Sequence, residues 1–391
     1  MKYGSIVPLI GGQTMGMEAA YGGKPEYFLS FDGFQGNDIH AREYYKDTPY
    51  YIIGTDKVPQ LEQVDVLSTT CPCAGLSSLS TSSNSNSPTN DWMLESAKYA
   101  LEVIKPEVFW GENAPRLASA MGRPVVDKLR AIAKENGYTF SLMKTKTLLH
   151  GLPQVRDRSF YFFWKGEHCP VFDLEHKPRK RIEDLIRSAS PCDILTNKKI
   201  PSEDPLYRFV LDEIGGGKSH PEFVESCKDM DRSKTAYELV EDAGISYLDV
   251  AKWMRSQGHE KKAERFDVVY EKLKAGKNIM RHGVMIPIDY TGAFVGHIPM
   301  SMTHPDIDRH LSLREALDMM GMPQDFELQG GIKNLNHICQ NVPVTTARDM
   351  AQQIDKYLSG DLERVKTDFL IQNNKKQEVE YIETKQQTLF T

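Results

Sequence analysis

Long apolar segments and a secretion signal are absent from this sequence of 391 residues. No uninterrupted apolar run approaches the roughly 18–20 residues that span a membrane. The first seven residues, MKYGSIV, lack the basic and apolar regions of a signal peptide and look like a first strand. We therefore expect a cytoplasmic protein that has no contact with a membrane.

Cysteine is scarce, and positive charge is not in excess. The six cysteines are scattered over the chain, which argues against a disulfide framework. Cys71 and Cys73 have Cys-x-Cys spacing, but no Cys/His cluster elsewhere completes a zinc site, so we expect no metal. The net charge of −6 argues against a protein that coats nucleic acid non-specifically. It does not exclude a local basic groove, because phosphate contacts depend on local charge.

The first 165 residues alternate strand-like apolar runs with helical stretches. The apolar runs are 5–10, 27–31, 50–54, 64–69, 107–111, 140–143 and 160–164, and the helical stretches are 17–21, 92–104 and 125–136. Such alternation predicts an α/β fold with a largely parallel sheet, whose active edge lies at the carboxyl ends of the strands.

The character of the chain changes after residue 165. Residues 166–298 are charged and irregular, with helical pieces near 233–243 and 247–277, and we predict a separate smaller domain there. Residues 299–360 return to compact helical segments and complete the first domain, 1–165. Residues 361–391 are rich in Lys and Gln, and we predict a polar C-terminal tail.

Cys73 follows the apolar run 64–69 and precedes the serine-rich segment 77–90. A cysteine between a proline and small residues at the end of a strand is placed for nucleophilic attack. Taken alone, it is more often a buried structural residue. Of the two neighbouring cysteines, Cys73 is in the register that favours catalysis. Cys71 is not, and we expect it to pack in the interior.

Three further patches accompany Cys73. They are Glu112-Asn113-Ala114, the run 150–158 (HGLPQVRDR), and the run 309–316 (RHLSLREA). Together with Cys73 they resemble, in order and spacing, the cytosine-C5 DNA methyltransferases. The family's Pro-Cys-Gln, Glu-Asn-Val and Gln-x-Arg-x-Arg patterns appear here as Pro72-Cys73-Ala74, Glu112-Asn113-Ala114 and the run 154–158 (QVRDR). The sequence departs from the family at Ala74, where the glutamine is lost. The resemblance covers most of the chain.

The resemblance implies the doubly wound, Rossmann-like α/β fold of methyltransferases that use S-adenosylmethionine as methyl donor. Residues 166–298 are then an inserted target-recognition domain, with double-stranded DNA in the cleft between the domains. The implied reaction is methyl transfer to carbon 5 of a flipped cytosine. Family members serve restriction-modification systems, phages or other processes in prokaryotic or phage-infected cells, and the sequence does not choose among these.

The resemblance also assigns catalytic roles. The thiolate of Cys73 adds to carbon 6 of cytosine, which turns carbon 5 into a nucleophile. Glu112 protonates or hydrogen-bonds N3 and relieves the negative charge on the ring. Arg158 faces O2 of the base through its planar donor fork. Arg156 supports either the DNA backbone or the site.

A cofactor site is implied at the first strand. The family's Phe-x-Gly-x-Gly-Gly appears as residues 7–12 (VPLIGG), which lack the aromatic residue and the first glycine. Asp32 is placed for the ribose hydroxyls and Asp56 for the adenine amine, although either can also be an ordinary turn carboxylate. Because this site departs most from the family pattern, a changed pocket for the methyl donor is an alternative. The full set of expected cofactor contacts is Gly11, Gly12, Gly16, Asp32, Asp56, Pro72 and Asn341.

Nucleic-acid contacts are expected from three places. The serine-rich segment 77–90 closes over the flipped base in this interpretation, and Lys177 to Arg181 either grips the backbone or is a solvated basic turn. The residues expected to contact nucleic acid are Ser77, Ser80, Gln154, Arg179 and Arg181. Gln386 to Phe390 (QQTLF) resembles the peptide that docks in bacterial sliding clamps.

Two alternatives stay open at this point. A tRNA cytosine-C5 methyltransferase has the same catalytic core, although the long insertion favours DNA. A DNA-binding relative with lost or altered-donor activity is suggested by the changed residues Ala74, Leu9 and Gln340.

Overall fold

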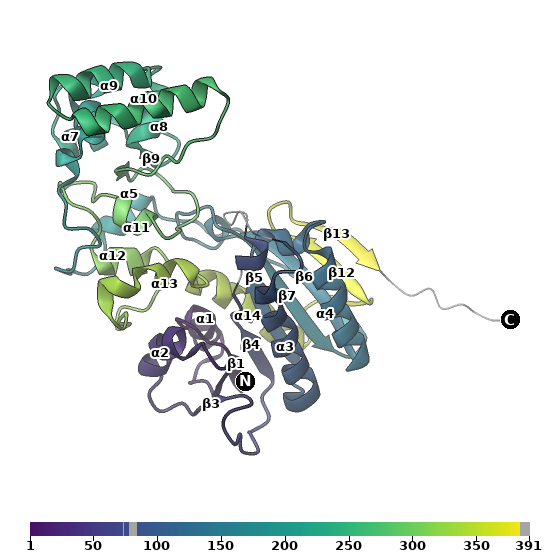
Figure 1. Cartoon of the computed structure of the whole chain (residues 1–391). Coiled ribbons are helices and arrows are strands. Elements are labelled where there is room, and N and C mark those ends of the chain that lie inside the picture. The colour runs from purple at the N-terminus through teal and green to yellow at the C-terminus, as the bar shows by residue number, and fades with distance from the viewer. Residues whose placement is uncertain (73, 78–83, 384–391) are drawn as a thin grey trace.

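The computed structural model of the chain describes residues 1–72, 74–77 and 84–383. Within these ranges nine strands form one sheet in the order β13-β12-β6-β7-β5-β4-β1-β2-β3. All neighbouring strands are parallel except where β7 pairs with β5 and β6 and where β13 pairs with β12. The expected doubly wound α/β sheet is confirmed (Figure 1).

The strands are mostly short. Their bounds are β1 Tyr3–Ile6, β2 Phe28–Ser30, β3 Tyr50–Ile52, β4 Val66–Thr69, β5 Val108–Asn113, β6 Tyr138–Lys146, β7 Asp157–Lys165, β8 His168–Pro170, β9 Lys234–Thr235, β10 Met285–Ile286, β11 Arg364–Lys366, β12 Phe369–Asn373 and β13 Glu378–Glu383. Apart from the main sheet, β8 pairs with β11 and β9 with β10.

The helices alternate with the strands in the first part of the chain and dominate the middle. Their bounds are α1 Gly12–Tyr21, α2 Gln35–Tyr44, α3 Asp91–Tyr99, α4 Arg123–Glu135, α5 Ile182–Arg187, α6 Pro205–Phe209, α7 His220–Ser226, α8 Ala236–Asp242, α9 Tyr247–Ser256, α10 Glu260–Lys274, α11 Ile298–Ser301, α12 Leu313–Asp318, α13 Leu335–Gln340 and α14 Val344–Ser359. Every helix in the described ranges is too short or too polar to cross a membrane.

Alternating side chains of the central strands fill two separate cores. Leu67 and Phe109 point to the face that helices α3 and α4 cover. Val66, Val108 and Trp110 point to the opposite face, which packs against α1 and α14. Because successive strand residues face opposite sides, and both sides are covered, the apolar runs read from the sequence are continuous.

Helices α1 and α14 approach each other very closely at Gly16. A Cβ on Gly16 would lie 2.4 Å from Cβ of Ala347 and 2.7 Å from the backbone N of Arg348. A substituent there must therefore push the two helices apart. The need for glycine at this position comes from helix packing.

Gly16→Ala is expected to lower the free energy of unfolding by about 2–3 kcal/mol, because the added methyl overpacks the α1–α14 contact. Thermal and urea unfolding measure the effect. Gly36→Ala is a matched control in α2, since a Cβ on Gly36 meets nothing within 4 Å. The control should be neutral or stabilising by about 0.5–1 kcal/mol. Equal stability of the two variants would contradict this account.

The middle of the chain has a hydrophobic core of its own. That cluster draws its buried residues from the range 206–288, including Tyr207, Val250 and Ile286. It forms the upper part of the molecule in Figure 1, around α7 to α10. The segment just after residue 165 stays with the large sheet instead: β8 pairs with β11, and the amide of Phe172 donates to Gln372 at 2.8 Å.

The expectation of a polar tail from residue 361 needs correction. Residues 364–383 are folded, with β12 parallel to β6 and β13 along its outer side. Phe369 and Leu370 are fully buried, and the Phe369 ring stacks on Phe140 at 5.9 Å. The sheet buries this short apolar pair, although the surrounding sequence is polar.

Candidate active site

Three strands of the parallel sheet end side by side. Ile6 pairs with Thr69, and Thr69 pairs with Gly111. The segments that follow β1, β4 and β5 therefore leave the sheet at one edge, as expected for a site in this fold class. The sequence singled out the segments after β1 and β4, 7–12 and 70–77, and the run 112–114, which begins with the last two residues of β5.

Glu112 and Arg158 form an ion pair at this edge. The Nε of Arg158 contacts the Oε1 of Glu112, and the two side chains are only 13% and 4% exposed. The antiparallel pairing of β5 with β7, with Asn113 opposite Ser159, brings these two elements together. A guanidinium held beside a buried carboxyl orients both groups. The Nη1 of Arg158 also donates to the Asp157 carbonyl oxygen at 2.7 Å, which leaves Nη2 for a ligand.

The segment that carries Cys73 is anchored on both sides. Cys73 itself, like Ser80, lies outside the described residues. Before it, the hydroxyl of Thr70 donates to Gln13 at 3.2 Å. After it, Gly75 lies against Asn90, because a Cβ on Gly75 would be 2.3 Å from the Asn90 Oδ1. The described residues on either side of position 73 are thus held by contacts with α1 and with Asn90.

Cys71 packs in the interior, as predicted. It is 3% exposed, and its Sγ lies 3.4 Å from both the Trp92 carbonyl oxygen and the Ser96 hydroxyl. Burial raises the pKa of the Cys71 thiol, despite hydrogen bonds from Ser96 and Thr69 that lower it. A neutral buried thiol is a poor nucleophile.

The serine-rich segment is tied down at its far end. The Asn90 amide donates to the carbonyl oxygens of Asn84 and Ser85, each at 3.1 Å. At the near end, Arg116 donates to the carbonyl oxygen of Ser77 at 3.2 Å. Residues 78–83 between these anchors lie outside the described ranges.

The turn after β1 has an unusual backbone. Val7 and Leu9 have φ values of +50° and +51°, and Gly11 follows at +98°. Leu9 stands where the resembled pattern has its first glycine, so a non-glycine residue adopts the left-handed conformation there. This costs about 1–2 kcal/mol per residue and persists only where the surroundings hold it.

Asp38 holds this turn and was not anticipated from the sequence. Its Oδ1 accepts the Leu9 amide at 2.8 Å, and its Oδ2 accepts the hydroxyls of Ser30 and Tyr50 at 2.5 and 2.9 Å. Asp38 is fully buried on α2. Nothing in the local sequence distinguishes it from any acid in the first turn of a helix, because its partners lie on other strands.

Burial raises the pKa of Asp38 to about 6, although hydrogen bonds from Ser30, Leu9 and Tyr50 lower it. The folded state therefore binds this proton more tightly than the unfolded state. The resulting stabilisation is present below the unfolded pKa of 3.8 and is lost as the pH rises through about 6.

Asp38→Asn is expected to remove this pH dependence, because asparagine stays neutral and keeps an oxygen for the Leu9 amide. Between pH 4.5 and 7.5 the wild type should lose roughly 2 kcal/mol more unfolding free energy than the variant. Urea unfolding at the two pH values measures the difference. Parallel pH profiles for the two proteins would refute the assignment of this proton to Asp38.

Gly12 lies against the segment of Asn341. Its amide donates to the Asn341 Oδ1 at 2.9 Å, and a Cβ on Gly12 would lie 2.1 Å from the Val342 carbonyl oxygen. The expected reason for Gly12 and Gly16, close approach to a ligand, thus needs correction: packing against 341–348 requires both. Only Gly11 is needed for its backbone conformation.

Asp32 and Asp56 both follow strands, and both are exposed. Asp32 accepts a hydrogen bond from the side chain of Gln35 at 2.9 Å. The Oδ2 of Asp56 accepts the amide of Ile52 at 2.6 Å, the geometry of a turn carboxylate. The structure thus favours the role of a turn carboxylate for Asp56. Asp32 stays a candidate for the ribose hydroxyls, since its carboxylate is exposed.

The residues around the turn fit a nucleoside with a charged amino-acid arm. The N-terminus of α1 begins at Gly12 and presents backbone amides at the carboxyl edge of the sheet. Asp32 supplies an exposed carboxylate for hydroxyl groups. Phe31 and Phe34 gather around the half-buried Trp92, with ring centroids 5.2 and 5.1 Å from it, and provide aromatic surface for a base.

Gln154 and Arg156 have structural roles here. Gln154 is fully buried, donates to the Met319 carbonyl oxygen at 2.6 Å and accepts the Phe294 amide at 3.2 Å, so the expected nucleic-acid contact is corrected. Arg156 is 2% exposed and donates to the carbonyl oxygens of Phe294 and Asn341. Of its two expected roles, this geometry matches support of the site.

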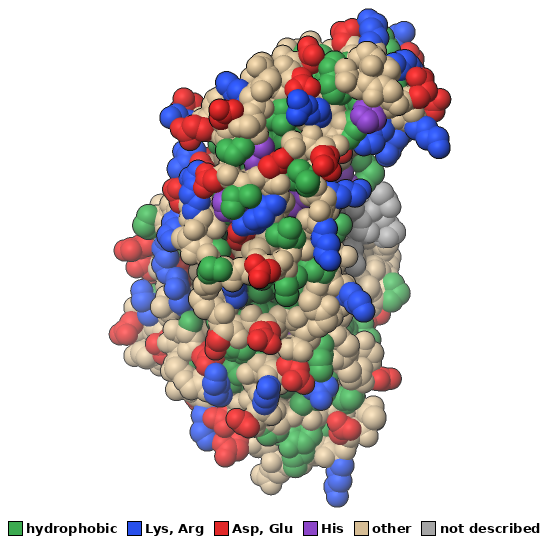
Figure 2. All heavy atoms as spheres, turned by 90° about the vertical axis from the view of Figure 1, so that its left-hand side faces the viewer, with side chains coloured by type: hydrophobic (Ala, Val, Ile, Leu, Met, Phe, Trp, Pro, Cys, Tyr) green, Lys and Arg blue, Asp and Glu red, His purple; other side chains and the backbone are tan. Residues whose placement is uncertain are grey.

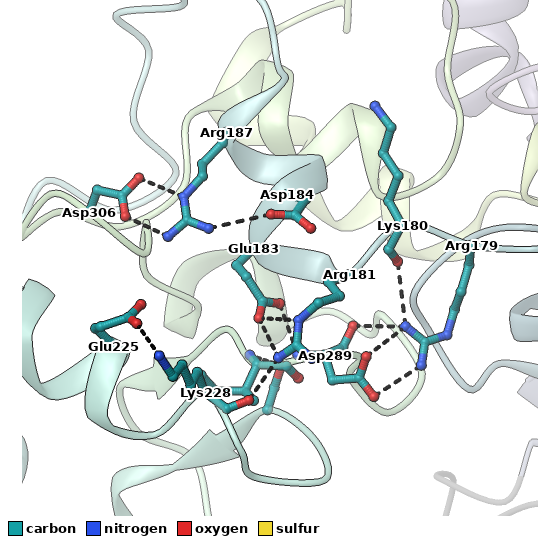
Figure 3. A network of polar contacts seen from close by, with 12 residues as sticks. Arg179, Lys180, Arg181, Glu183, Asp184, Arg187, Glu225, Lys228, Asp289 and Asp306 are labelled. Atoms are coloured by element: carbon teal, nitrogen blue, oxygen red, sulfur yellow. Dashed lines mark hydrogen bonds and ion pairs between the residues drawn. The ribbon is translucent and has the colours of Figure 1, made fainter.

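Arg179 and Arg181 are also engaged within the chain. Arg179 forms a two-pronged ion pair with Asp289, and Arg181 pairs with Glu183 (Figure 3). The expectation of a phosphate grip at these residues is therefore corrected, because their donors already have carboxylate partners. On the face in Figure 2, Lys and Arg are intermixed with Asp and Glu.

Comparison with known proteins places these features in one family. The family model for C-5 cytosine-specific DNA methylases matches residues 3–356. The Type II methylase M.HgiDII of Herpetosiphon aurantiacus is 22% identical over 279 residues, which cover 69% of this chain and 71% of the relative.

Two solved structures share the fold. A protein described as a DNA modification methyltransferase encoded within a prophage (E. coli) has a TM-score of 0.58 at 14% identity, covering 92% of this chain and 99% of that one. The Entamoeba histolytica methyltransferase EhMeth has a TM-score of 0.52 at 12% identity, covering 92% and 98%. At these identities the likeness concerns the fold alone.

Proposed function

This chain belongs to the C-5 cytosine-specific DNA methylase family, and from that premise we propose its substrate, its intermediate and the role of each site residue. The proposed reaction is methyl transfer from S-adenosylmethionine to carbon 5 of a cytosine flipped out of double-stranded DNA. The observation that carries the proposal is the nearly buried Glu112–Arg158 pair at the end of β5, where Gly111 lies opposite Thr69 at the end of β4.

The residues of this edge divide the chemistry among them. The Cys73 thiolate forms a covalent bond to carbon 6 of cytosine. After the methyl group has bonded to carbon 5, the carbon-5 proton passes to water acting as a base, and its electron pair restores the ring double bond and expels the thiolate. Glu112 donates to N3 and takes up the charge that develops on the ring, while Arg158 donates to O2. When bound, S-adenosylmethionine supplies the electrophilic methyl group. Arg156 keeps its supporting role beneath them.

The turn 7–12 and its neighbours are the proposed cofactor site. The backbone amides of the first turn of α1 after Gly12 bind the charged arm, and Asp32 binds the ribose hydroxyls. Pro72 lines the site from the side of the nucleophile. Asn341 supports the turn indirectly, by accepting the hydrogen bond of the Gly12 amide.

Within residues 166–298, the part with its own core, 206–288, is the proposed target-recognition domain, with DNA between it and the sheet domain. Segment 77–90 closes over the flipped base in this proposal. Its anchors at Arg116 and Asn90, on either side of residues 78–83, support such a role. Serine hydroxyls and asparagine amides are suitable donors to phosphate.

Trapping the covalent intermediate tests this function. Duplex DNA containing 5-fluorocytosine, incubated with the protein and S-adenosylmethionine, should yield a stable protein–DNA adduct. The same incubation with 5-fluorocytosine-containing tRNA should yield none. An adduct with tRNA alone would favour the tRNA enzyme, and a folded, cofactor-binding protein without any adduct would favour the inactive relative.

The clamp-binding peptide Gln386 to Phe390 lies outside the described residues and stays a prediction. Deleting residues 386–391 should abolish retention on an immobilised bacterial sliding clamp. Unchanged retention would refute it.

A further inference from the structure

Asp289 is the point where the inserted domain returns to the sheet domain. Its backbone is left-handed, with φ +51°, which is uncommon for a residue other than glycine. Its amide donates to the Glu183 carboxylate at 2.9 Å, and its carbonyl oxygen accepts the Ile182 amide at 2.8 Å. Arg179 donates to both oxygens of its carboxylate, at 2.9 and 3.0 Å.

Backbone and side chain of Asp289 are therefore all bonded to the outgoing segment 179–183 (Figure 3). We name Arg179, Ile182, Glu183 and Asp289 the crossover knot. A residue held in a strained conformation by so many partners is over-determined by its surroundings, and such strain is concentrated at functional sites. The knot joins the segment that leaves the sheet domain to the segment that returns.

The knot is continuous with the core of the inserted domain. Ile288 belongs to that core, and its amide and carbonyl oxygen both bond to the Ser233 hydroxyl, at 3.0 and 3.2 Å. The carbonyl oxygen of Tyr290 accepts the Ser233 amide at 2.8 Å. The residues on either side of Asp289 thus both bond to Ser233, a buried residue of the inserted domain.

On its other side the knot leads directly to the active-site segment. The Thr291 amide donates to Pro153 at 3.0 Å, and the Val155 amide donates back to Thr291 at 2.9 Å. Phe294 continues the contact, with its amide on the Gln154 side chain and its carbonyl oxygen on Arg156. Arg158 follows Arg156 by two residues in this active-site segment.

We propose that Asp289 is a positioning residue: through residues 291–294 it holds segment 153–158 in register, and so fixes the Arg158–Glu112 pair relative to the inserted domain. This inference rests on the proposed function and adds a physical link between target recognition and catalysis. A shift of the inserted domain on its DNA passes through the knot to the arginine that faces the base. The distance that Arg158 can tolerate is small, because donors act only at hydrogen-bond range.

Two substitutions separate the carboxylate from the backbone shape. Asp289→Asn keeps a residue that tolerates the left-handed conformation but loses the charge that Arg179 grips. Asp289→Gly relieves the strain altogether and removes the side chain. Asp306→Asn is the matched control, because it breaks the equally two-pronged pair with Arg187 outside the knot, at 2.7 and 2.8 Å.

Both Asp289 variants are expected to lower kcat for methylation of unmethylated genomic DNA by about 10-fold or more, as misplacement of a catalytic group does. KM for S-adenosylmethionine should stay within about twofold, since this linkage reaches the cofactor turn indirectly, through the bond of Arg156 to the Asn341 carbonyl oxygen. Hydrogen exchange of the peptides spanning 153–156 and 291–294 should become faster. The Asp306→Asn control should leave both readouts unchanged.

Two results would overturn the proposal. One is a lowered Tm with unchanged kcat in both Asp289 variants, which indicates a structural role alone. The other is unchanged exchange in 153–156 and 291–294. If the wild-type protein transfers no methyl group, the proposed function is refuted. The hydrogen-exchange measurement then still decides whether the knot holds segment 153–158.

Discussion

Cys73→Ser is expected to abolish turnover, lowering kcat by at least about 1,000-fold, or about 4 kcal/mol in the activation barrier. A cysteine has an appreciable thiolate fraction near neutral pH, whereas a serine hydroxyl stays protonated without a strong base. Cofactor binding should persist, because the proposed cofactor contacts lie elsewhere. Incorporation of a labelled methyl group into DNA measures the loss.

Cys71→Ser is the matched control for this variant. Cys71 lies two residues away, and its buried thiol contacts Thr69 and Ser96. The control should keep its methylation rate and lose some stability, since it places a hydroxyl among core residues. If Cys73→Ser methylates DNA at the wild-type rate, or if Cys71→Ser alone is inactive, the nucleophile has been misassigned.

Glu112→Gln is expected to lower kcat by about 100-fold or more, the size of a typical general acid or base contribution. Glutamine keeps the shape of the side chain and a hydrogen-bond donor, but it cannot transfer a proton to N3. The variant also leaves Arg158 without its carboxylate partner in a nearly buried place. Stability should therefore fall as well, and thermal unfolding must accompany the rate measurement.

Glu107→Gln separates these two effects. Glu107 precedes the same strand, β5, and its ion pair with Lys165 at 2.7 Å is half exposed. This variant should change neither the rate nor the stability measurably, because exposed pairs contribute little. A Glu112→Gln protein that is destabilised but methylates normally would show that the pair is structural and that the proton comes from elsewhere.

The sheet domain was largely predictable because its signals are local. Apolar runs at 27–31, 50–54 and 64–69 became β2, β3 and β4, each shorter by two residues. Alternation of strands and helices depends on side chains close in sequence. The pairing partners are not local. β12 joins the sheet through β6, more than 200 residues earlier, and its polar surroundings conceal the buried pair Phe369 and Leu370.

The candidate site divides in the same way. Glu112 and Arg158 were named from their motifs, and the structure brings them together. Gln154, Arg179 and Arg181 were expected to face nucleic acid, because polar residues near a motif are read as exposed. They are instead bonded to Met319, Asp289 and Glu183, partners that no local pattern reveals.

The sequence by itself determined the family, the positions of the first strands along the chain and the chemical identity of the catalytic candidates. These depend on residue types at fixed spacings, which the chain states directly. Only the tertiary structure decided why Gly12 and Gly16 are glycines, that Asp38 holds the strained turn at Leu9, and that Asp289 joins the two domains. Each of these depends on contacts between segments far apart in the chain, and a carboxylate or a glycine acquires its role only from the atoms that folding places against it.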